Sequence, residues 1–149
     1  MDHGFKAAEL FLNGYNCAQS VVVAFSDLTG LDEAFSAKLA SSFGGGMGRM
    51  REVCGAVSGM LMVLGLLYGY DTPGDDVSKK AQYTVVQELS ARFREQIGSI
   101  VCREILKNPP SDPNPSPRTA EYYAKRPCAR MVLTAASILD DYIKEHPYA

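Results

Sequence analysis

Four cysteines are the residues of this sequence best able to do chemistry. They are Cys17, Cys54, Cys102 and Cys128, and they lie far apart along the chain. No two of them have the Cys-x-x-Cys spacing of a zinc ribbon, a thioredoxin-type motif or a c-type haem site. A thiolate is both a nucleophile and a ligand for soft metals, so these residues predict redox or metal chemistry if the fold gathers them. The two histidines lie near the chain ends, where we expect them to be solvated, and no Ser/His/Asp set suggests hydrolysis.

The four cysteines share a predicted position near the beginning of a helix. Cys17 directly follows Asn16, a good N-cap residue, and Cys128 follows a proline that can open a helix. Cys54 and Cys102 fall close to the starts of two further helices. The unpaired N–H groups and about half a positive charge at such an end stabilise a thiolate relative to a thiol. We therefore expect these positions to lower the pKa values of the thiols.

Helical periodicity indicates where these thiols point. Cys17, Cys102 and Cys128 lie on the apolar stripes of their helices, so their side chains should face the interior. Inward thiols from separate helices can meet in a bundle core, as metal ligands do. The alternative is that each cysteine is an inert, buried, small hydrophobic residue.

The sequence around Cys54 is rich in small residues. Gly55 and Gly59 leave one side of the predicted helix almost without side chains, so that either a cofactor or a tightly packed helix can approach. The preceding run, residues 44–48, is a glycine-rich loop that carries Arg49. We expect Gly55, Gly59 and Arg49 to contact a bound cofactor, with the arginine offsetting negative charge. The loop itself is interpreted as a flexible connector, since no strand precedes it as in a phosphate-binding motif.

The remaining pattern is helical from end to end and predicts a single all-α domain over residues 1–149. Six to seven helices should surround a central, buried, glycine-rich helix at about 52–68. In the first helix we expect Phe5, Ala8 and Leu12 on the buried face. Other helices are expected at about 2–13, 16–29, 32–43, 76–96, after Ser99, at 119–125 and from 127 onward. The buried face of the long helix at 76–96 should hold Val77, Ala81, Val85, Leu89 and Phe93.

Composition excludes several classes of protein. The 149 residues carry 15 basic and 17 acidic side chains, a net charge of −2, which argues against a nucleic-acid partner. The uncharged stretch 53–70 barely reaches the length of a membrane span and is diluted by glycine and serine, so we interpret it as the buried helix. The beginning of the sequence has no secretory pattern, and we expect a cytoplasmic protein, in a reducing compartment where structural disulfides are uncommon.

Two stretches of the sequence resemble a known family. They are Gly14-Tyr15-Asn16-Cys17-Ala18-Gln19 and Cys54-Gly55-Ala56-Val57-Ser58-Gly59. Two later single cysteines, Cys102 and Cys128, also match the family. The resemblance is to the C_GCAxxG_C_C family of redox-active proteins, and it covers nearly the whole chain. It implies that the four cysteines act together in redox chemistry, and similar domains beside haem modules imply iron–sulfur binding. Family genes often lie near transporter genes, which implies a link to a transport system.

Three functions remain open on the sequence. The first is electron transfer or thiol/disulfide chemistry by Cys17, Cys54, Cys102 and Cys128, either as bare thiols or as ligands of a [2Fe–2S] cluster. The second is a site for zinc or another soft metal bound by the same four residues. The third is a helical interaction protein with inert core cysteines. We favour the first, with an unidentified redox partner and with homodimer formation left open, over turnover of an organic substrate.

Overall fold

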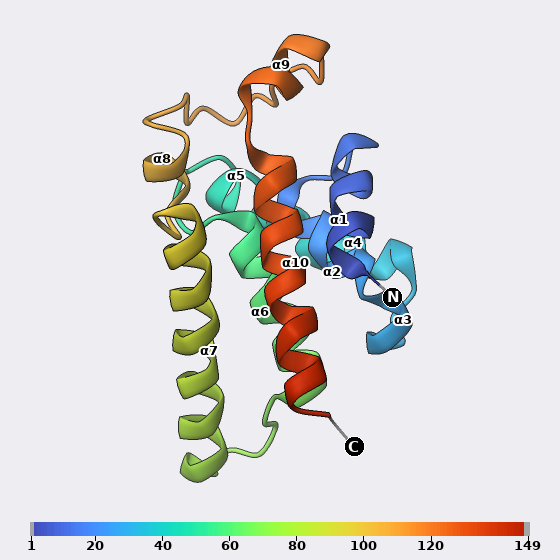
Figure 1. Cartoon of the computed structure of the whole chain (residues 1–149), viewed down its shortest axis with the longest axis vertical. Coiled ribbons are helices and arrows are strands. Elements are labelled where there is room, and N and C mark those ends of the chain that lie inside the picture. The colour runs from blue at the N-terminus through green and yellow to red at the C-terminus, as the bar shows by residue number, and fades with distance from the viewer. Residues whose placement is uncertain (1, 148–149) are drawn as a thin grey trace.

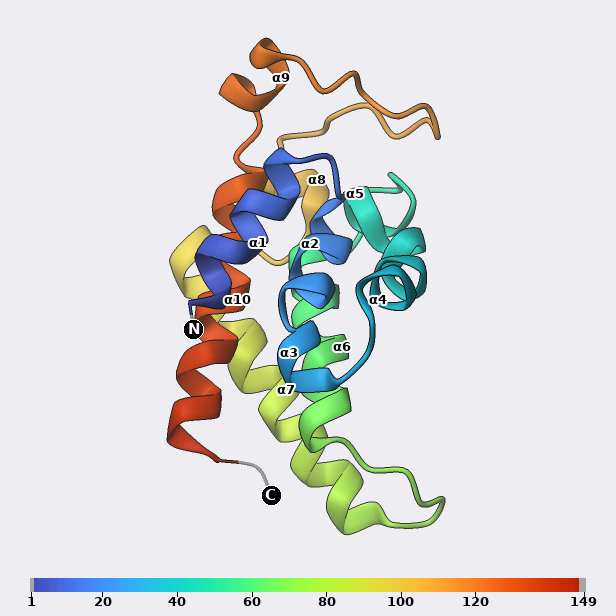
Figure 2. The same ribbon diagram turned by 90° about the vertical axis from the view of Figure 1, so that its right-hand side faces the viewer.

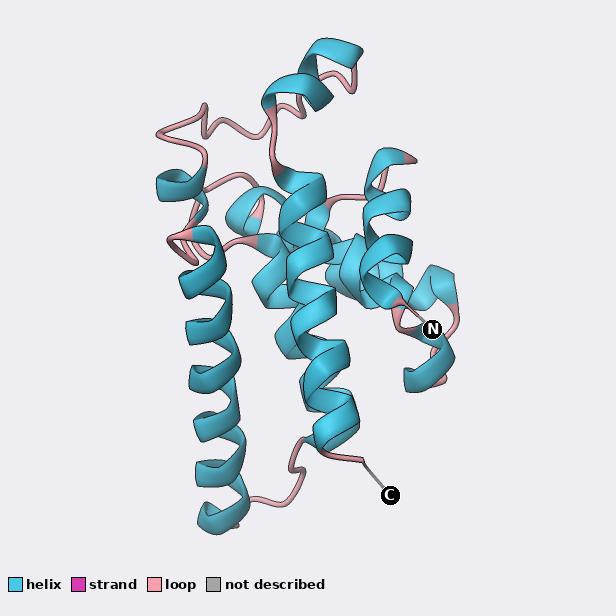
Figure 3. Cartoon of the chain, in the orientation of Figure 1, coloured by secondary structure: helices cyan, strands magenta, loops and turns pink. Residues whose placement is uncertain are grey.

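Helices make up all of the regular secondary structure in the computed structural model, which describes residues 2–147 (Figure 3). Over those residues six helices have seven or more residues, and the one extended contact is an isolated antiparallel bridge between Val53 and Val101. The all-α prediction is thus confirmed. In chain order the elements are α1 (His3–Leu12), α2 (Cys17–Ala24), α3 (Ser26–Thr29), α4 (Glu33–Ala40), the 3₁₀ turn η1 (Ser41–Phe43), α5 (Gly44–Met47), α6 (Gly55–Tyr68), α7 (Asp76–Ile97), α8 (Cys102–Ile105), α9 (Ala120–Lys125) and α10 (Cys128–Glu145).

Local sequence signals explain most of these boundaries. Asn16 and Gln19 form a complete capping box at the start of α2, each side chain accepting a hydrogen bond from the other's backbone N–H. The helix expected at 16–29 is instead divided at Phe25 into α2 and the short α3. Gly30 and Gly98 end α3 and α7 in the left-handed conformation that glycine adopts without strain.

The helices pack around a core between α2, α6 and α10 (Figures 1 and 2). α1 lies along α10 and against α2, while the long α7 runs beside α10 and α6. The two views place the first residues of α6, α8 and α10 toward one end of the molecule, below α9. The largest fully buried side chains include Phe11, Phe25, Met60, Phe93 and Leu139. This arrangement brings several helix N-termini to a single end of the core.

The buried face of α1 differs from the predicted one. Phe5 and Leu12 are 69% and 53% exposed, whereas His3, Ala7 and Phe11 are buried. The reason is the close approach of α10. A Cβ atom added at Gly4 would lie 3.2 Å from the carbonyl oxygen of Leu133 and would overlap a side chain of α10. The small residues of α1 therefore face the bundle, and two of its larger apolar residues face outward.

The prediction for α7 is correct only in its second half. Leu89 and Phe93 are fully buried and Val85 is half-buried, but Val77 is 83% exposed and Ala81 is also exposed. The first turns of α7 extend past the helices that could cover them (Figure 1). Periodicity showed which side of this helix is apolar but not how far the core extends along it.

The uncharged stretch 53–70 forms α6, as the sequence predicts. This helix spans only 14 residues, and seven of them are buried in the core. Within residues 2–147 we find no helix whose length and apolar character would suffice to cross a bilayer.

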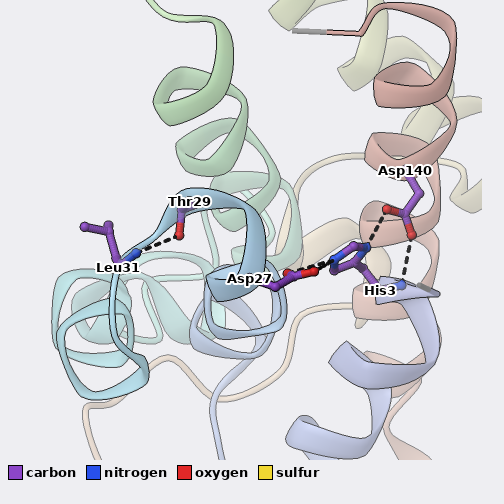
Figure 4. Close-up of polar contacts among 5 residues, drawn as sticks. All are labelled: His3, Asp27, Thr29, Leu31 and Asp140. Carbon is purple, nitrogen blue, oxygen red and sulfur yellow. Dashed lines mark hydrogen bonds and ion pairs between the residues drawn. The ribbon is translucent and has the colours of Figure 1, made fainter. Parts of the chain in front are cut away.

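His3 is buried, so the expectation that it is solvated is wrong. Its ring lies between two carboxylates, with Nδ1 2.6 Å from Asp140 Oδ1 and Nε2 3.0 Å from Asp27 Oδ1 (Figure 4). The ring also stacks on Phe25 with 4.1 Å between centroids. Both ring nitrogens must donate in this arrangement, which only the protonated imidazolium can do. Burial lowers the pKa of His3, but the hydrogen bonds and charges of Asp140 and Asp27 together outweigh it and raise the pKa above its ordinary value. The network joins α1, α3 and α10.

We expect His3 to stabilise the fold most strongly in acid. The folded state holds the proton more tightly than the unfolded chain, so the contribution is fully present below pH 6.5 and is lost as the pH rises through the raised pKa. Each unit of elevation is worth about 1.4 kcal/mol. Urea unfolding of the wild type and of His3→Gln, from about pH 5.5 to about pH 8.5, should give a difference that shrinks with rising pH. A difference that grows with pH would contradict the assignment.

The double variant Asp27→Asn/Asp140→Asn is a control for the cause of the shift. Without the two carboxylates, burial alone acts on the imidazole and should depress its pKa below 6.5. The contribution of His3 to the free energy of unfolding should then reverse its trend and rise with pH.

Candidate four-cysteine site

The four cysteines line one cavity of about 70 Å³ at the end of the molecule where several helices begin. Cys17, Cys102 and Cys128 are the first residues of α2, α8 and α10, and Cys54 is the N-cap of α6. Cys17 is 8% exposed, Cys54 and Cys102 are each 6% exposed, and Cys128 is half-buried. The predicted placement at helix starts thus agrees with the structure, which brings all four thiols to the same space.

Two of the cysteines are held together by the isolated bridge. The backbone N–H of Cys54 donates to the carbonyl oxygen of Ile100 at 2.7 Å. The backbone N–H of Cys102 donates to the carbonyl oxygen of Glu52, also at 2.7 Å. These bonds flank the Val53–Val101 bridge. They align the entries to α6 and α8 side by side, so that Cys54 and Cys102, which are far apart in the sequence, line one cavity.

The glycine-rich segment forms a tight left-handed turn against these thiols. Five consecutive residues, 45–49, have φ between 57° and 71°, a conformation that costs most residues about 1–2 kcal/mol each. The backbone N–H of Gly45 lies near the Cys17 thiol and acts to lower its pKa. A Cβ atom at Gly46 would lie 2.8 Å from that of Cys102. The segment that we expected to be a flexible connector is therefore a fixed part of the cavity wall.

A buried arginine extends this wall. Arg51 is 4% exposed; its Nη1 donates to the Cys102 sulfur at 3.7 Å, and its Nε donates to the carbonyl oxygen of Pro110 at 2.9 Å. Arg118 and Arg126 also line the cavity. Arg49 lines the adjoining surface hollow instead.

Burial, rather than the helix N-terminus, dominates the pKa values of the thiols. Desolvation raises the pKa of Cys17, although the N–H groups of Gly45 and Ala18 act against it. Burial raises the pKa of Cys54 well above its usual range and that of Cys128 to about 12. The expectation of lowered pKa values is therefore wrong for these three thiols. Helix N–H groups do lower the pKa values of Cys17 and Cys54, but by less than the loss of water raises them.

The donor set suits a soft metal or an iron–sulfur cluster, since four thiolates can hold either. As the side chains stand, however, no three Cys, His, Asp or Glu residues in the described part of the chain converge to hold a single ion. The sulfurs surround a cavity instead of meeting at one point. The four thiols around one cavity are the residues that could hold a group bound by thiolates.

The sequence comparisons agree with this cysteine arrangement. Residues 15–142 match a family described as "Putative redox-active protein (C_GCAxxG_C_C)". The chain belongs to this family. The matched region contains all four cysteines of the cavity. The C_GCAxxG_C_C pattern is written with glycine before its second cysteine, whereas here Gly55 follows Cys54. No curated protein and no solved structure matches the chain.

The two motif glycines of this C_GCAxxG_C_C chain meet different neighbours. Gly55 lines the cavity, and a Cβ atom there would overlap the Cys17 sulfur and lie 2.8 Å from the carbonyl oxygen of Phe43. Gly59 faces α2, where a Cβ atom would lie 2.8 Å from the carbonyl oxygen of Ala18. Gly59 thus allows two helices to pack closely, and it does not line the cavity. Its expected contact with a cofactor stays a prediction.

Replacing Gly55 with alanine should disturb the site and the fold together. The added methyl group must displace Cys17 or α2, and overpacking of this kind typically lowers the free energy of unfolding by about 1–3 kcal/mol. The measurement is urea unfolding, combined with the rate at which a thiol reagent labels Cys17. Gly65→Ala is the matched control on the same helix, because nothing lies within 4 Å of its added Cβ. It should stabilise α6 by up to about 1 kcal/mol. Equal effects of the two substitutions would contradict the packing described here.

Proposed function

We propose that this protein transfers electrons through an iron–sulfur cluster of the [2Fe–2S] type, held by Cys17, Cys54, Cys102 and Cys128. The observation that carries the proposal is that all four thiols line the same small cavity. Such a cluster, when bound, supplies one-electron redox chemistry. The chain's own contribution is to hold the thiols, exclude water and set the local charge.

The arrangement of the sulfurs favours a cluster over a single zinc ion. A structural zinc site needs four ligands directed at one point, about 2.3 Å from each sulfur. No such convergence exists among the described residues. A two-iron cluster takes its four thiolates in pairs around a wider body, which agrees better with sulfurs that enclose a cavity.

The depth of the thiols favours electron transfer over thiol/disulfide exchange. Exchange requires a thiolate to reach the sulfur of a partner directly. Cys17, Cys54 and Cys102 are at most 8% exposed, and burial raises the pKa of Cys17 and Cys54, so few accessible thiolates exist near neutral pH. Electron transfer needs no covalent contact with the partner.

The charges around the cavity support an anionic occupant. A cluster with four thiolate ligands is negatively charged, and a buried negative charge needs positive neighbours or hydrogen-bond donors. Arg51 donates to the Cys102 sulfur, and the charges of Arg126 and Arg118 lower the pKa of Cys128 against the effect of burial. Backbone N–H groups at the starts of α2 and α6 add further donors.

Protein purified without oxygen should be brown and should contain iron and acid-labile sulfide in equal amounts. Serine at any one of the four cysteine positions should lower the iron content several-fold, because a hydroxyl is a much harder and weaker ligand than a thiolate. Elemental analysis and visible absorption measure both. Met131→Leu is the matched control, because Met131 also lines the cavity with a sulfur atom and the exchange nearly conserves volume. It should retain the iron.

Other results would favour the alternatives. Colourless protein with four titratable thiols that form disulfides on mild oxidation would contradict the cluster and favour thiol/disulfide chemistry. Zinc in place of iron, unchanged by reductants, would favour a soft-metal site. Wild-type protein isolated without any cofactor, together with unchanged stability and partner binding after all four cysteines are replaced, would favour the helical interaction protein.

A further inference from the structure

A second hollow adjoins the cysteine cavity and is lined by four arginines. This arginine cleft has a volume of about 390 Å³ and shares Arg51, Arg118 and Arg126 with the lining of the cavity. Arg49 is the fourth. No Asp or Glu lines it, and the remaining wall comes from Asn16, Ser41, the glycine-rich turn, the proline-rich loop at residues 108–117 and α9. Its volume lies within the range of about 300–1,000 Å³ that is usual for small-molecule sites.

The positive charge of the arginine cleft is not balanced by the protein. Within residues 2–147, none of the four guanidinium groups forms an ion pair with a carboxylate. The charge of Arg49 does act on Asp112, but that carboxylate accepts a hydrogen bond from Asn114 and does not line the cleft. The chain as a whole carries a net charge of −2. Four unpaired cations in one hollow are therefore a local feature and not a reflection of a basic protein.

Arg126 and Arg49 have N–H groups without a hydrogen-bond acceptor, whereas Arg118 is held in place by hydrogen bonds. Arg118 donates to the carbonyl oxygens of Phe11 and Tyr15, both at 3.0 Å, and these neutral acceptors fix its position without cancelling its charge. Among the described residues nothing accepts a hydrogen bond from the guanidinium of Arg126. The Nε atom of Arg49 is buried without an acceptor. A buried donor without a partner costs about 1–3 kcal/mol, which a ligand could remove.

We propose that the arginine cleft binds a small molecule that carries two negative charges on carboxylate or phosphate oxygens. The guanidinium fork matches both of these groups in a bidentate arrangement, and a divalent anion can use several arginines together. The inference does not depend on a cluster in the cysteine cavity. It needs only the charges and donors that the chain itself provides.

The test is to titrate the protein with inorganic phosphate and, separately, with succinate, and to measure the heat of binding by calorimetry at fixed pH and ionic strength. At least one of them should bind to the wild type with a saturable isotherm, and the tighter of the two identifies the chemical class. Arg126→Gln and Arg49→Gln should each weaken that binding about tenfold, equivalent to about 1.4 kcal/mol. Arg126→Lys keeps the charge but loses the fork, so it should fall between the wild type and Arg126→Gln.

Arg94→Gln is the matched control, because Arg94 is an exposed arginine of α7 that does not line the cleft and forms no ion pair among the described residues. It should change the dissociation constant less than twofold. Circular dichroism should show that each variant keeps the helical content of the wild type. Absence of saturable binding for both anions would overturn the proposal, and so would equal weakening by the control and the cleft variants. Because metal-free protein can be titrated as well, failure here leaves the proposed electron transfer untouched.

Discussion

Four helices can begin around one small cavity only if the chain between them bends sharply and packs without bulky side chains. The glycine-rich turn before α6 provides both, because five of its residues have left-handed φ values and the absence of a side chain at Gly46 lets the turn pack against Cys102. Three non-glycine residues, Met47, Arg49 and Arg51, also have positive φ. Backbone strain of this kind persists only where the surrounding structure requires it, and such places are often functional sites.

At this end of the molecule, buried thiolates and buried arginine side chains can neutralise each other's charge. Burial makes a thiolate costly at Cys17, Cys54 and Cys128, and it makes a guanidinium without an anionic partner costly at Arg51. Each cost falls when the opposite charge is present. Thiolate ligands and arginines therefore belong to one system, in which filling the cavity with an anionic group would stabilise the arginine side chains already in place.

The sequence was sufficient for the parts of the fold that local chemistry determines. Capping by Asn16 and the period of apolar residues located most helices, and placing the cysteines at helix starts required nothing more. The sequence could not give the buried face of α1, which depends on the approach of α10 at Gly4, nor the partners of His3, which lie 24 and 137 residues away.

Two arginines of the candidate site could not be predicted from the sequence, because they reach the cavity from a distant part of the chain. Arg118 follows the proline-rich loop and Arg126 is the C-cap of α9, and neither segment has a periodicity that would direct these side chains to the cysteines. The pKa values of the thiols depend on long-range packing for a related reason. The helix end is visible in the sequence, but the burial that outweighs it is a property of the packed molecule.

The cavity takes its walls from residues near the beginning of the chain and from residues beyond position 125. Arg118 ties the two regions together through the carbonyl oxygens of Phe11 and Tyr15. During synthesis, which proceeds at about 5–20 residues per second from the N-terminus, Cys17 and Cys54 emerge from the ribosome several seconds before Cys128 exists. A nascent chain therefore carries its first two thiols uncovered, and any group that requires all four can be inserted only after translation has passed α10's first turn.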